Sequence, residues 1–562
     1  GNLQFSTVQS NRIAGYTPSG RIGIRTGRWT LTASGSGSFT PVAESRFTET
    51  REQAGQPLPF AGRSDSKSRT NYGRGHFSAV FDPTPKHTAG FDIEYTERST
   101  HMPTLSRTTL GQTQSDSRYR QHMDGNTLTA TANYIWKIDT LGSQFKLIAD
   151  YTRYTSDGDN SYHTTTCAPG TLRDSLYESA TGSVYDILTA DAGLTRKLPH
   201  GLTLRAGLRY TRNDMADKSR YAAQTQGTWL ALPEYSYDQH YTEQIGAAYA
   251  SLEYSAGRWE LSAGLRGEYT SVASQAFGRS YFGLFPNVSV SRALNALRTW
   301  LLVAQWSRNI ERPAFPALNP ARIRISDYSW QSGNPSLRPT YIHRFSLTAV
   351  WKYRYTLTVG GNLHHDLIRE IAHRDATAPD AVYIRPENHY TENHWFVAAS
   401  VPAKITRWWN LSVNAVGVMQ RIRLNSTDSP ATHYLMFADA TCSFTLPAGF
   451  FAEAAYRAQS RLYSGNSEVG PRHTLSATVK KQLFDKRLTL FCTLSNITGC
   501  DWEFASLTDG MRRTIDTRQA WSGRLWKVGA AWNFRTGKKF RARTVESAAE
   551  TQRKRLVKST EQ

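Results

Sequence analysis

Apolar and polar residues alternate with a period of two along most of this chain. From Leu202 to Tyr210 every second residue is apolar, and the residues between are threonine, arginine or glycine. Nearly the same pattern recurs from Trp259 to Tyr269. Because successive side chains of a β-strand point to opposite faces, each such segment has one apolar and one polar face. The pattern predicts β-strands along the whole chain, and no stretch of comparable length has helical periodicity.

The alternating segments predict about 22 strands. They lie at 2–10, 18–26, 28–40, 70–82, 88–98, 120–137, 143–155, 184–197, 202–213, 238–255, 258–272, 280–293, 298–309, 340–352, 354–372, 389–402, 408–423, 431–446, 449–463, 469–484, 487–499 and 519–535.

The connections between these segments alternate between tight turns and longer polar segments. The tight turns are at Gly27, Asp82–Pro85, Leu198–Gly201, Ala256–Gly257, Pro447–Ala448 and Asp485–Lys486, and the long connections are at 41–69, 99–119, 156–183, 214–237, 310–339 and 500–518. Transmembrane barrels have short periplasmic turns and longer extracellular loops. The pattern therefore predicts an all-β, antiparallel, up-and-down transmembrane barrel over residues 1–535, in the outer membrane of a Gram-negative bacterium.

Composition supports this fold class. Hydrophobic residues make up 39% of the chain and aromatic residues 12%, an aromatic content too high for a disordered chain. Tryptophans such as Trp29, Trp136 and Trp526 lie near strand ends, where rings favour a membrane interface. The net charge of +21 is scattered along the chain, which argues against nucleic acid as a partner and favours a wet lumen or the phosphates of membrane lipid and lipopolysaccharide.

The sequence offers little chemistry beyond transport. No serine lies in a recognisable nucleophile motif, so an enzyme is not expected, and the four cysteines predict neither a zinc site nor a disulfide framework. Asp157–Asn160 lacks the full spacing of a calcium loop and is interpreted as a turn. His364 and His365 would point to opposite faces of a strand and could not share a metal. We expect no metal and no cofactor.

The two ends of the chain differ from the barrel that they flank. A barrel of about 22 strands belongs to the class with a plugged lumen. The first predicted strand begins at residue 2 and no segment of this chain could be the plug, so we expect that a plug domain precedes Gly1 in the native protein. Residues 536–562 are rich in lysine and arginine and poor in apolar residues, which predicts a disordered periplasmic tail.

The long connection 310–339 carries a set of ordered motifs. Arg312-Pro313 is followed by Leu318-Asn319-Pro320 and then by Gly333-Asn334-Pro335-Ser336-Leu337-Arg338-Pro339. These motifs resemble the loop and strand entry shared by TonB-dependent receptors. Ala247-Ala248-Tyr249, Gly264-Leu265-Arg266, Leu284-Phe285-Pro286 and Leu494-Ser495-Asn496-Ile497 are similar to the outer-membrane β-barrel family that forms the barrel of such receptors. The resemblance covers essentially the whole chain.

The resemblance implies energised uptake of a scarce ligand, either an iron chelate, cobalamin, a glycan or a peptide. The partners would be a TonB-type energy-coupling complex, acting through the missing plug, with a surface lipoprotein as a further candidate. The prolines of 310–339 cannot continue a sheet ladder, which predicts a rigid loop folded over the mouth. Its residues Arg312, Arg322, Arg324, Tyr328 and Trp330 would then either face a ligand or brace the loop. A passive porin or a structural, adhesive barrel is the alternative function.

Overall fold

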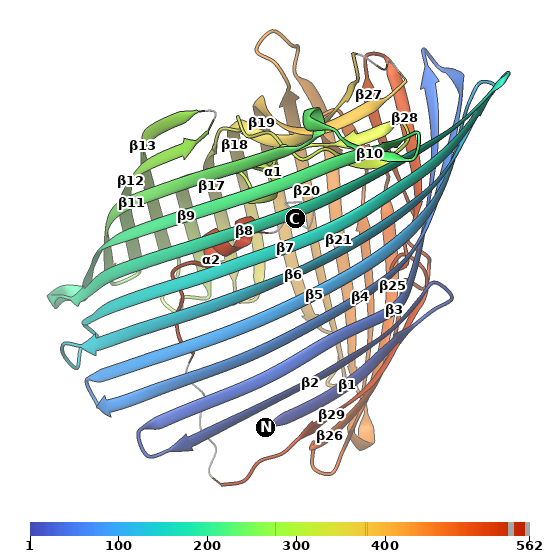
Figure 1. The fold of residues 1–562 in the computed structure, drawn as a ribbon. Coiled ribbons are helices and arrows are strands. Elements are labelled where there is room, and N and C mark those ends of the chain that lie inside the picture. Colours follow the sequence, from blue (N-terminus) through green and yellow to red (C-terminus); the bar gives the residue numbers. More distant parts are fainter. Residues whose placement is uncertain (276, 377, 379, 538–543, 557–562) are drawn as a thin grey trace.

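The chain forms one closed barrel in the computed structural model, which describes residues 1–275, 277–376, 378, 380–537 and 544–556 (Figure 1). Within these residues 22 antiparallel strands make up the wall. They are β1 (Asn2–Gln9), β2 (Ile13–Thr26), β3 (Trp29–Gln53), β4 (Gln56–Thr84), β5 (His87–Leu110), β6 (Thr113–Lys137), β7 (Gln144–Ala168), β8 (Thr171–Lys197), β9 (Leu202–Thr225), β11 (Tyr237–Ala256), β12 (Trp259–Ser274), β13 (Gly278–Ala293), β14 (Trp300–Glu311), β17 (Thr340–Trp351), β18 (Tyr355–Arg374), β19 (Val382–Lys404), β20 (Trp409–Arg423), β21 (Ala431–Thr445), β22 (Phe450–Gln459), β25 (Arg472–Leu483), β26 (Leu488–Ser495) and β29 (Leu525–Asn533).

Shorter elements lie in the connections. They are β10 (Thr228–Ala231), β15 (Ile323–Ser326), β16 (Ser329–Gln331), β23 (Leu462–Ser464), β24 (Ser467–Val469), β27 (Trp502–Thr508), β28 (Met511–Arg518), α1 (Phe315–Leu318), α2 (Glu550–Arg553), and the 3-10 turns η1 (Pro199–Gly201), η2 (Pro233–Tyr235), η3 (Pro447–Gly449) and η4 (Lys554–Leu556).

The barrel closes between its first and last strands. β1 pairs with β29 in an antiparallel register that runs from Asn2 opposite Asn533 to Gln9 opposite Trp526. Closure leaves the wall without a free edge, so every strand is paired on both sides. The predicted number and order of strands are confirmed, and so are the short turns except that β4 continues to Thr84, so the turn predicted at Asp82–Pro85 lies at Pro85-Lys86.

The two faces of the wall differ as the alternation predicts. Large apolar side chains such as Leu208, Leu265 and Tyr269 are exposed on the outside. Their neighbours along the strands, including Thr211, Glu268 and Thr270, are buried on the inside. An exposed apolar band of this kind is the surface that a bilayer covers.

No helix in the described part of the chain is long and apolar enough to cross a membrane.

Five of the predicted long connections differ from the expectation. Segments 41–69, 99–119, 156–183, 214–237 and 500–518 are largely strand, and the ladder of β3–β4 continues to a two-residue turn at Ala54-Gly55. The interpretation of Asp157–Asn160 as a turn was wrong, because these residues lie inside β7 and pair with β6 and β8. Beyond the membrane both faces of a hairpin are wet, so the ladder continues while the apolar alternation that marks a strand disappears.

The loops at the mouth are joined into a second layer of pairing. β23, β24, β27 and β28 follow one another edge to edge, and β28 pairs with the upper part of β3. β15 and β16 form a small hairpin in the connection 312–339, and β16 runs parallel to the start of β19. These pairings lie at the end of the barrel opposite the N-terminus (Figure 1).

The predicted tail is described only in part, because 538–543 and 557–562 lie outside the described residues. Residues 544–556 lie within the barrel, where α2 follows the inner wall (Figure 1). Ala549 is fully buried and Arg555 is buried against Glu243 of β11. This placement differs from the disordered periplasmic tail expected for the segment.

Candidate ligand site at the barrel mouth

The connection 312–339 is folded into the barrel around a small apolar core. Phe315, Leu318 and Leu337 are almost fully buried against side chains of the inner wall, which are Tyr185, Ile187, Met215, Tyr241 and Val272. These wall residues come from β8, β9, β11 and β12. The core holds the connection inside the mouth, and its rigidity stays a prediction from its prolines.

The Gly333-Asn334-Pro335 motif closes this folded segment on itself. The backbone N–H of Asn334 donates to the carbonyl of Ala317 at 2.7 Å, and the Asn334 side chain donates to the carbonyl of Pro386 at 3.0 Å. A side chain at Gly333 would place its Cβ 2.1 Å from the carbonyl oxygen of Asn319. Only glycine allows this approach of two backbone segments.

Arg312 is held by the wall of the barrel. Its Nη2 donates to Glu268 at 2.7 Å and to the hydroxyl of Thr270 at 2.9 Å, and its Nε lies 3.9 Å from Glu243. The side chain is 9% exposed. These contacts brace the start of the segment and leave Arg312 little surface for a ligand.

Arg322, Arg324 and Trp330 form a cluster on the β15–β16 hairpin. The two guanidinium groups lie 5.1 and 5.3 Å from the Trp330 ring. Arg322 is paired with Asp375 at 3.2 Å and Arg324 with Asp327 at 2.6 Å. Arginine over an aromatic face is an attractive arrangement, and it keeps the hairpin compact.

Asp327 at the tip of this hairpin ties it to the opposite wall. Its carboxylate accepts hydrogen bonds from Ser117 at 2.6 Å, Tyr119 at 2.8 Å and Thr164 at 3.1 Å, in addition to Arg324. Burial and the nearby Asp327 raise the pKa of Tyr119, so its phenol stays protonated and donates.

Tyr328 belongs to the same hairpin and faces β3 and β4. Its ring meets the Phe60 ring edge-on with centroids 5.8 Å apart, and its carbonyl accepts from Val382 at 2.9 Å. The structure thus brings Arg322, Arg324, Tyr328 and Trp330 together, while Arg312 lies apart at the entry to the segment.

A cavity of about 430 Å³ lies between this hairpin and the extended strands of the wall. Five aromatic side chains and three arginines are among the residues that line it, namely Phe47, Phe60, Tyr119, Trp502, Phe504, Arg63, Arg324 and Arg513. Concave, largely apolar pockets with a few directed polar groups are the usual form of a ligand site. This cavity is the candidate site.

The charged floor of the cavity is Glu49 between two arginines. Glu49 accepts from Arg51 at 2.8 Å and from Arg513 at 2.8 Å. Burial alone would raise the pKa of Glu49, but Arg513 and Arg51 outweigh it and hold that pKa below its usual range. Arg513 is 2% exposed, and its Nε and Nη1 find no hydrogen-bond partner among the described residues. A buried donor in this state favours an acceptor in the cavity.

Of the predicted ligand residues, Arg324 lines the cavity. The other residues that line the cavity were not predicted from the sequence. Phe47, Glu49 and Arg51 follow each other at every second position, as do Trp502 and Phe504, so the period-two signal is present in both segments. It went unused because 41–69 and 500–518 were interpreted as loops. Among the described residues no group of three His, Cys, Asp or Glu could hold a metal ion.

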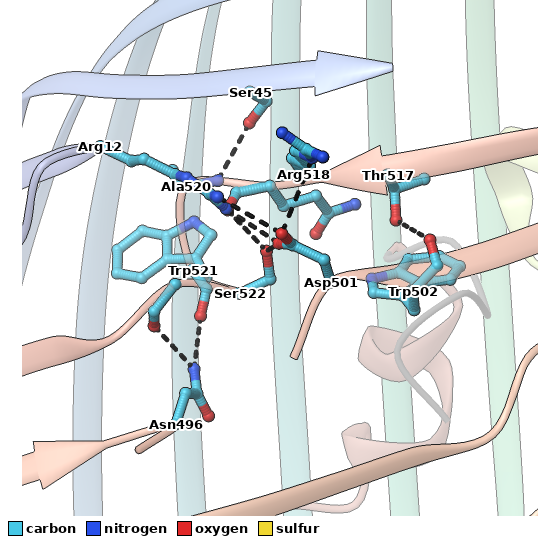
Figure 2. Close-up of polar contacts among 12 residues, drawn as sticks. Arg12, Ser45, Asn496, Asp501, Trp502, Thr517, Arg518, Ala520, Trp521 and Ser522 are labelled. Atoms are coloured by element: carbon cyan, nitrogen blue, oxygen red, sulfur yellow. Dashed lines mark hydrogen bonds and ion pairs between the residues drawn. The ribbon is translucent and has the colours of Figure 1, made fainter. Parts of the chain in front are cut away.

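A polar cluster beside the cavity joins the two ends of the barrel chain. Figure 2 shows Arg12, from the turn after β1, reaching Asp501 and Ser522. Nearby, Asn496 donates to the carbonyls of Trp521 at 2.7 Å and Gly523 at 3.2 Å. The Leu494–Ile497 motif therefore holds the last long loop against the seam, which is the line where β1 pairs with β29.

Comparison with known proteins places this geometry in context. No curated protein matches the chain in sequence. Among solved structures, a double mutant of the ferric enterobactin receptor PfeA from Pseudomonas aeruginosa is 14% identical, with a TM-score of 0.59 over 95% of this chain and 80% of that one. The siderophore receptor PirA from Acinetobacter baumannii is 13% identical and the ferric yersiniabactin uptake receptor FyuA from Yersinia pestis 12% identical, both with a TM-score of 0.58 over the same shares.

These structural likenesses show the fold. The family model described as the outer membrane protein beta-barrel family matches residues 136–532, which is more than half of the chain. The chain belongs to the outer membrane protein beta-barrel family, and it is an outer-membrane barrel that spans the bilayer with its strands.

Proposed function

We propose that this chain is the barrel of a TonB-dependent receptor that takes up a scarce ligand from the cell surface. The observation that carries the proposal is the segment 312–339, which is folded inside the mouth of a 22-stranded barrel and borders the candidate cavity. A barrel of this width needs its lumen closed, and a rigid element at the mouth forms a surface on which a ligand can be captured first.

The chemistry of the cavity favours an anionic ligand that carries rings. Its aromatic side chains offer stacking surfaces, and Arg513 offers two donors without a partner. Three of the structurally similar proteins are named as receptors for ferric enterobactin, a siderophore and ferric yersiniabactin. Of the classes that the sequence leaves open, we infer that an iron chelate is the ligand, with Arg324 and Arg513 as the residues that face it.

The energy source is tested by uptake in living cells. Cells that express the complete gene are given radioactive iron as a ferric tris-catecholate and as a ferric hydroxamate. We expect uptake of one of them, and we expect its loss when a protonophore is added or the TonB gene is deleted. Uptake that persists without energy would make the protein a passive porin. A surface lipoprotein partner stays a prediction.

The ligand site is tested by calorimetric titration of the purified protein with the chelate that the cells take up. Arg513→Met removes the unpartnered donors and should weaken binding about tenfold, since one charge-assisted hydrogen bond contributes roughly 1.5 kcal/mol or more. Arg173→Met changes an exposed arginine at the tip of the β7–β8 hairpin and should leave the affinity unchanged. Equal affinities for both variants would exclude this cavity as the site.

A further inference from the structure

Three neighbouring turns at the end of the barrel opposite the mouth form one continuous surface (Figure 1). They join β11 to β12 (256–258), β13 to β14 (294–299) and β17 to β18 (352–354). Nη2 of Arg298 donates to the carbonyl of Gly257 at 2.6 Å, and the backbone N–H of Lys352 donates to the carbonyl of Thr299 at 2.6 Å. Because these bonds tie each turn to the next, the turns lie side by side, and we call them together the turn surface.

The turn surface carries positive charge that the chain itself does not compensate. Its three turns contain no aspartate or glutamate, and their cations are Arg258, Arg298, Lys352 and Arg354. All four side chains are exposed, and within the described part of the chain none of them forms an ion pair. Exposed arginines of the extracellular hairpins differ in this respect, as the pair of Arg107 with Asp116 shows. The charge of the turn surface therefore favours an anion from outside the chain.

Tryptophans on the outer face of the barrel border the turn surface. Trp259, Trp300 and Trp351 are exposed there, and the rings of Trp300 and Trp351 stack with centroids 5.7 Å apart. Nζ of Lys352 lies 4.5 Å from the centre of the Trp351 ring, and the guanidinium of Arg292 lies 4.7 Å from that of Trp259. Tryptophan favours the boundary between the lipid chains and water, so these cations lie at the depth of the lipid headgroups.

The turns also expose large apolar side chains beside the cations. Leu297 is 81% exposed and Tyr353 is 67% exposed. Lys352 and Tyr353 both have a φ of 52°, a left-handed conformation in which a turn in water favours glycine or asparagine. Exposed apolar groups alternating with cations are the pattern of a segment that lies in a membrane interface.

We propose that the turn surface binds the headgroup of an anionic phospholipid in the periplasmic leaflet of the outer membrane. The guanidinium and ammonium groups donate to the phosphate oxygens, and Leu297 and the tryptophans contact the acyl chains next to the headgroup. A lipid with a net negative charge complements the cations, whereas a zwitterionic lipid brings a positive charge of its own. The inference does not depend on the transported ligand, because the turn surface and the candidate cavity lie at opposite ends of the barrel.

Native mass spectrometry of the full chain in detergent measures the lipid preference. The probes are phosphatidylglycerol and, as the zwitterionic reference, phosphatidylcholine with the same acyl chains. We expect phosphatidylglycerol to bind at least about tenfold more tightly, because each basic residue near an anionic lipid strengthens binding about fivefold. Equal binding of the two lipids would overturn the proposal. An excess of inorganic phosphate should leave the bound lipid in place, and displacement would identify free phosphate as the ligand and overturn the proposal as well.

A double variant tests the turn surface itself. Arg298→Gln combined with Lys352→Gln should weaken the binding of phosphatidylglycerol at least about tenfold and leave that of phosphatidylcholine unchanged. The matched control is Lys486→Gln combined with Arg487→Gln, which removes the same charge from the turn between β25 and β26, where Asp485 is adjacent. It should change the affinity little. Heat-modifiable mobility on a gel shows that both proteins are folded. Equal losses in the two double variants would mean that overall charge attracts the lipid, and would refute a site on the turn surface.

Discussion

Arg12 and Asp501 form an ion pair of 2.8 Å across the line where the barrel closes, although 489 residues separate them in the sequence. Asp501 also accepts from Ser522 at 2.5 Å. The pair joins the turn after the first strand to the loop before the last strand, directly above the pairing of β1 with β29.

Asp501→Asn should lower the free energy of unfolding by about 0.5–1 kcal/mol, because both side chains of the pair are partly exposed and water screens them. The measurement is a urea titration in lipid vesicles. Asp116→Asn is the matched control, since it breaks an exposed pair with Arg107 on neighbouring strands of one hairpin and leaves the seam intact. No measurable loss in Asp501→Asn would mean that the seam gains nothing from Arg12.

The contribution of Asp501 should depend on pH. Burial would raise its pKa, but Arg12 and Ser522 outweigh burial and lower the pKa below the ordinary value of 3.8. A group with a depressed pKa in the folded state stabilises fully above the unfolded value and less as the pH falls through the folded value. The difference between the unchanged protein and Asp501→Asn should therefore be constant above about pH 4 and disappear below it. A difference that persists in acid would contradict this assignment.

Leu265→Arg should destabilise the barrel by roughly 2–4 kcal/mol, because Leu265 is half exposed on the face that meets lipid near the middle of β12. The inward-facing control on the same strand is Ser262→Arg. Gly264 is unsuitable for this purpose, since a Cβ there would lie 2.7 Å from the Asn287 side chain. Folding titrations in bilayers should give a small loss for Ser262→Arg, and equal losses would invalidate the assignment of the two faces.

Gly333→Ala should release the segment 312–339 while the barrel stays folded. The added Cβ would overlap the carbonyl of Asn319, and relieving such overpacking costs about 1–3 kcal/mol. Hydrogen exchange should show faster exchange in 312–339 and no change in the wall. Gly417→Ala on β20 meets no atom within 4 Å and should behave as the unchanged protein. Full protection of the segment in Gly333→Ala would show that the close approach is unimportant.

Asp327→Ala should detach the β15–β16 hairpin from β6 and β7. It leaves Arg324 and the hydroxyls of Tyr119 and Ser117 without their shared acceptor, and removing one partner of a buried ion pair costs about 3–5 kcal/mol. The expected result is rapid hydrogen exchange in 323–331 and loss of chelate binding. Asp174→Ala removes an exposed carboxylate at a hairpin tip and should leave both measurements unchanged.

The prediction of the membrane-spanning strands from sequence succeeded because the bilayer imposes a local rule. One face of each strand meets lipid and the other meets water, so the alternation from Trp259 to Tyr269 marks both the strand and its orientation. The same rule explains the error in 41–69. Once the β3–β4 hairpin leaves the membrane, no apolar face is required and the pattern no longer distinguishes a paired strand from a loop.

The sequence by itself determined the strand count and the turns on one side of the barrel, because each follows from the local pattern. The close approach of Gly333 to the carbonyl of Asn319 was decided by the tertiary structure. The candidate cavity was decided by the tertiary structure, because it joins Phe60, Trp502 and Arg513 from segments hundreds of residues apart. The same holds for the place of Arg555 against Glu243, 312 residues away. Such contacts depend on how the closed barrel brings distant segments together, and no periodicity along the chain indicates which segments will meet.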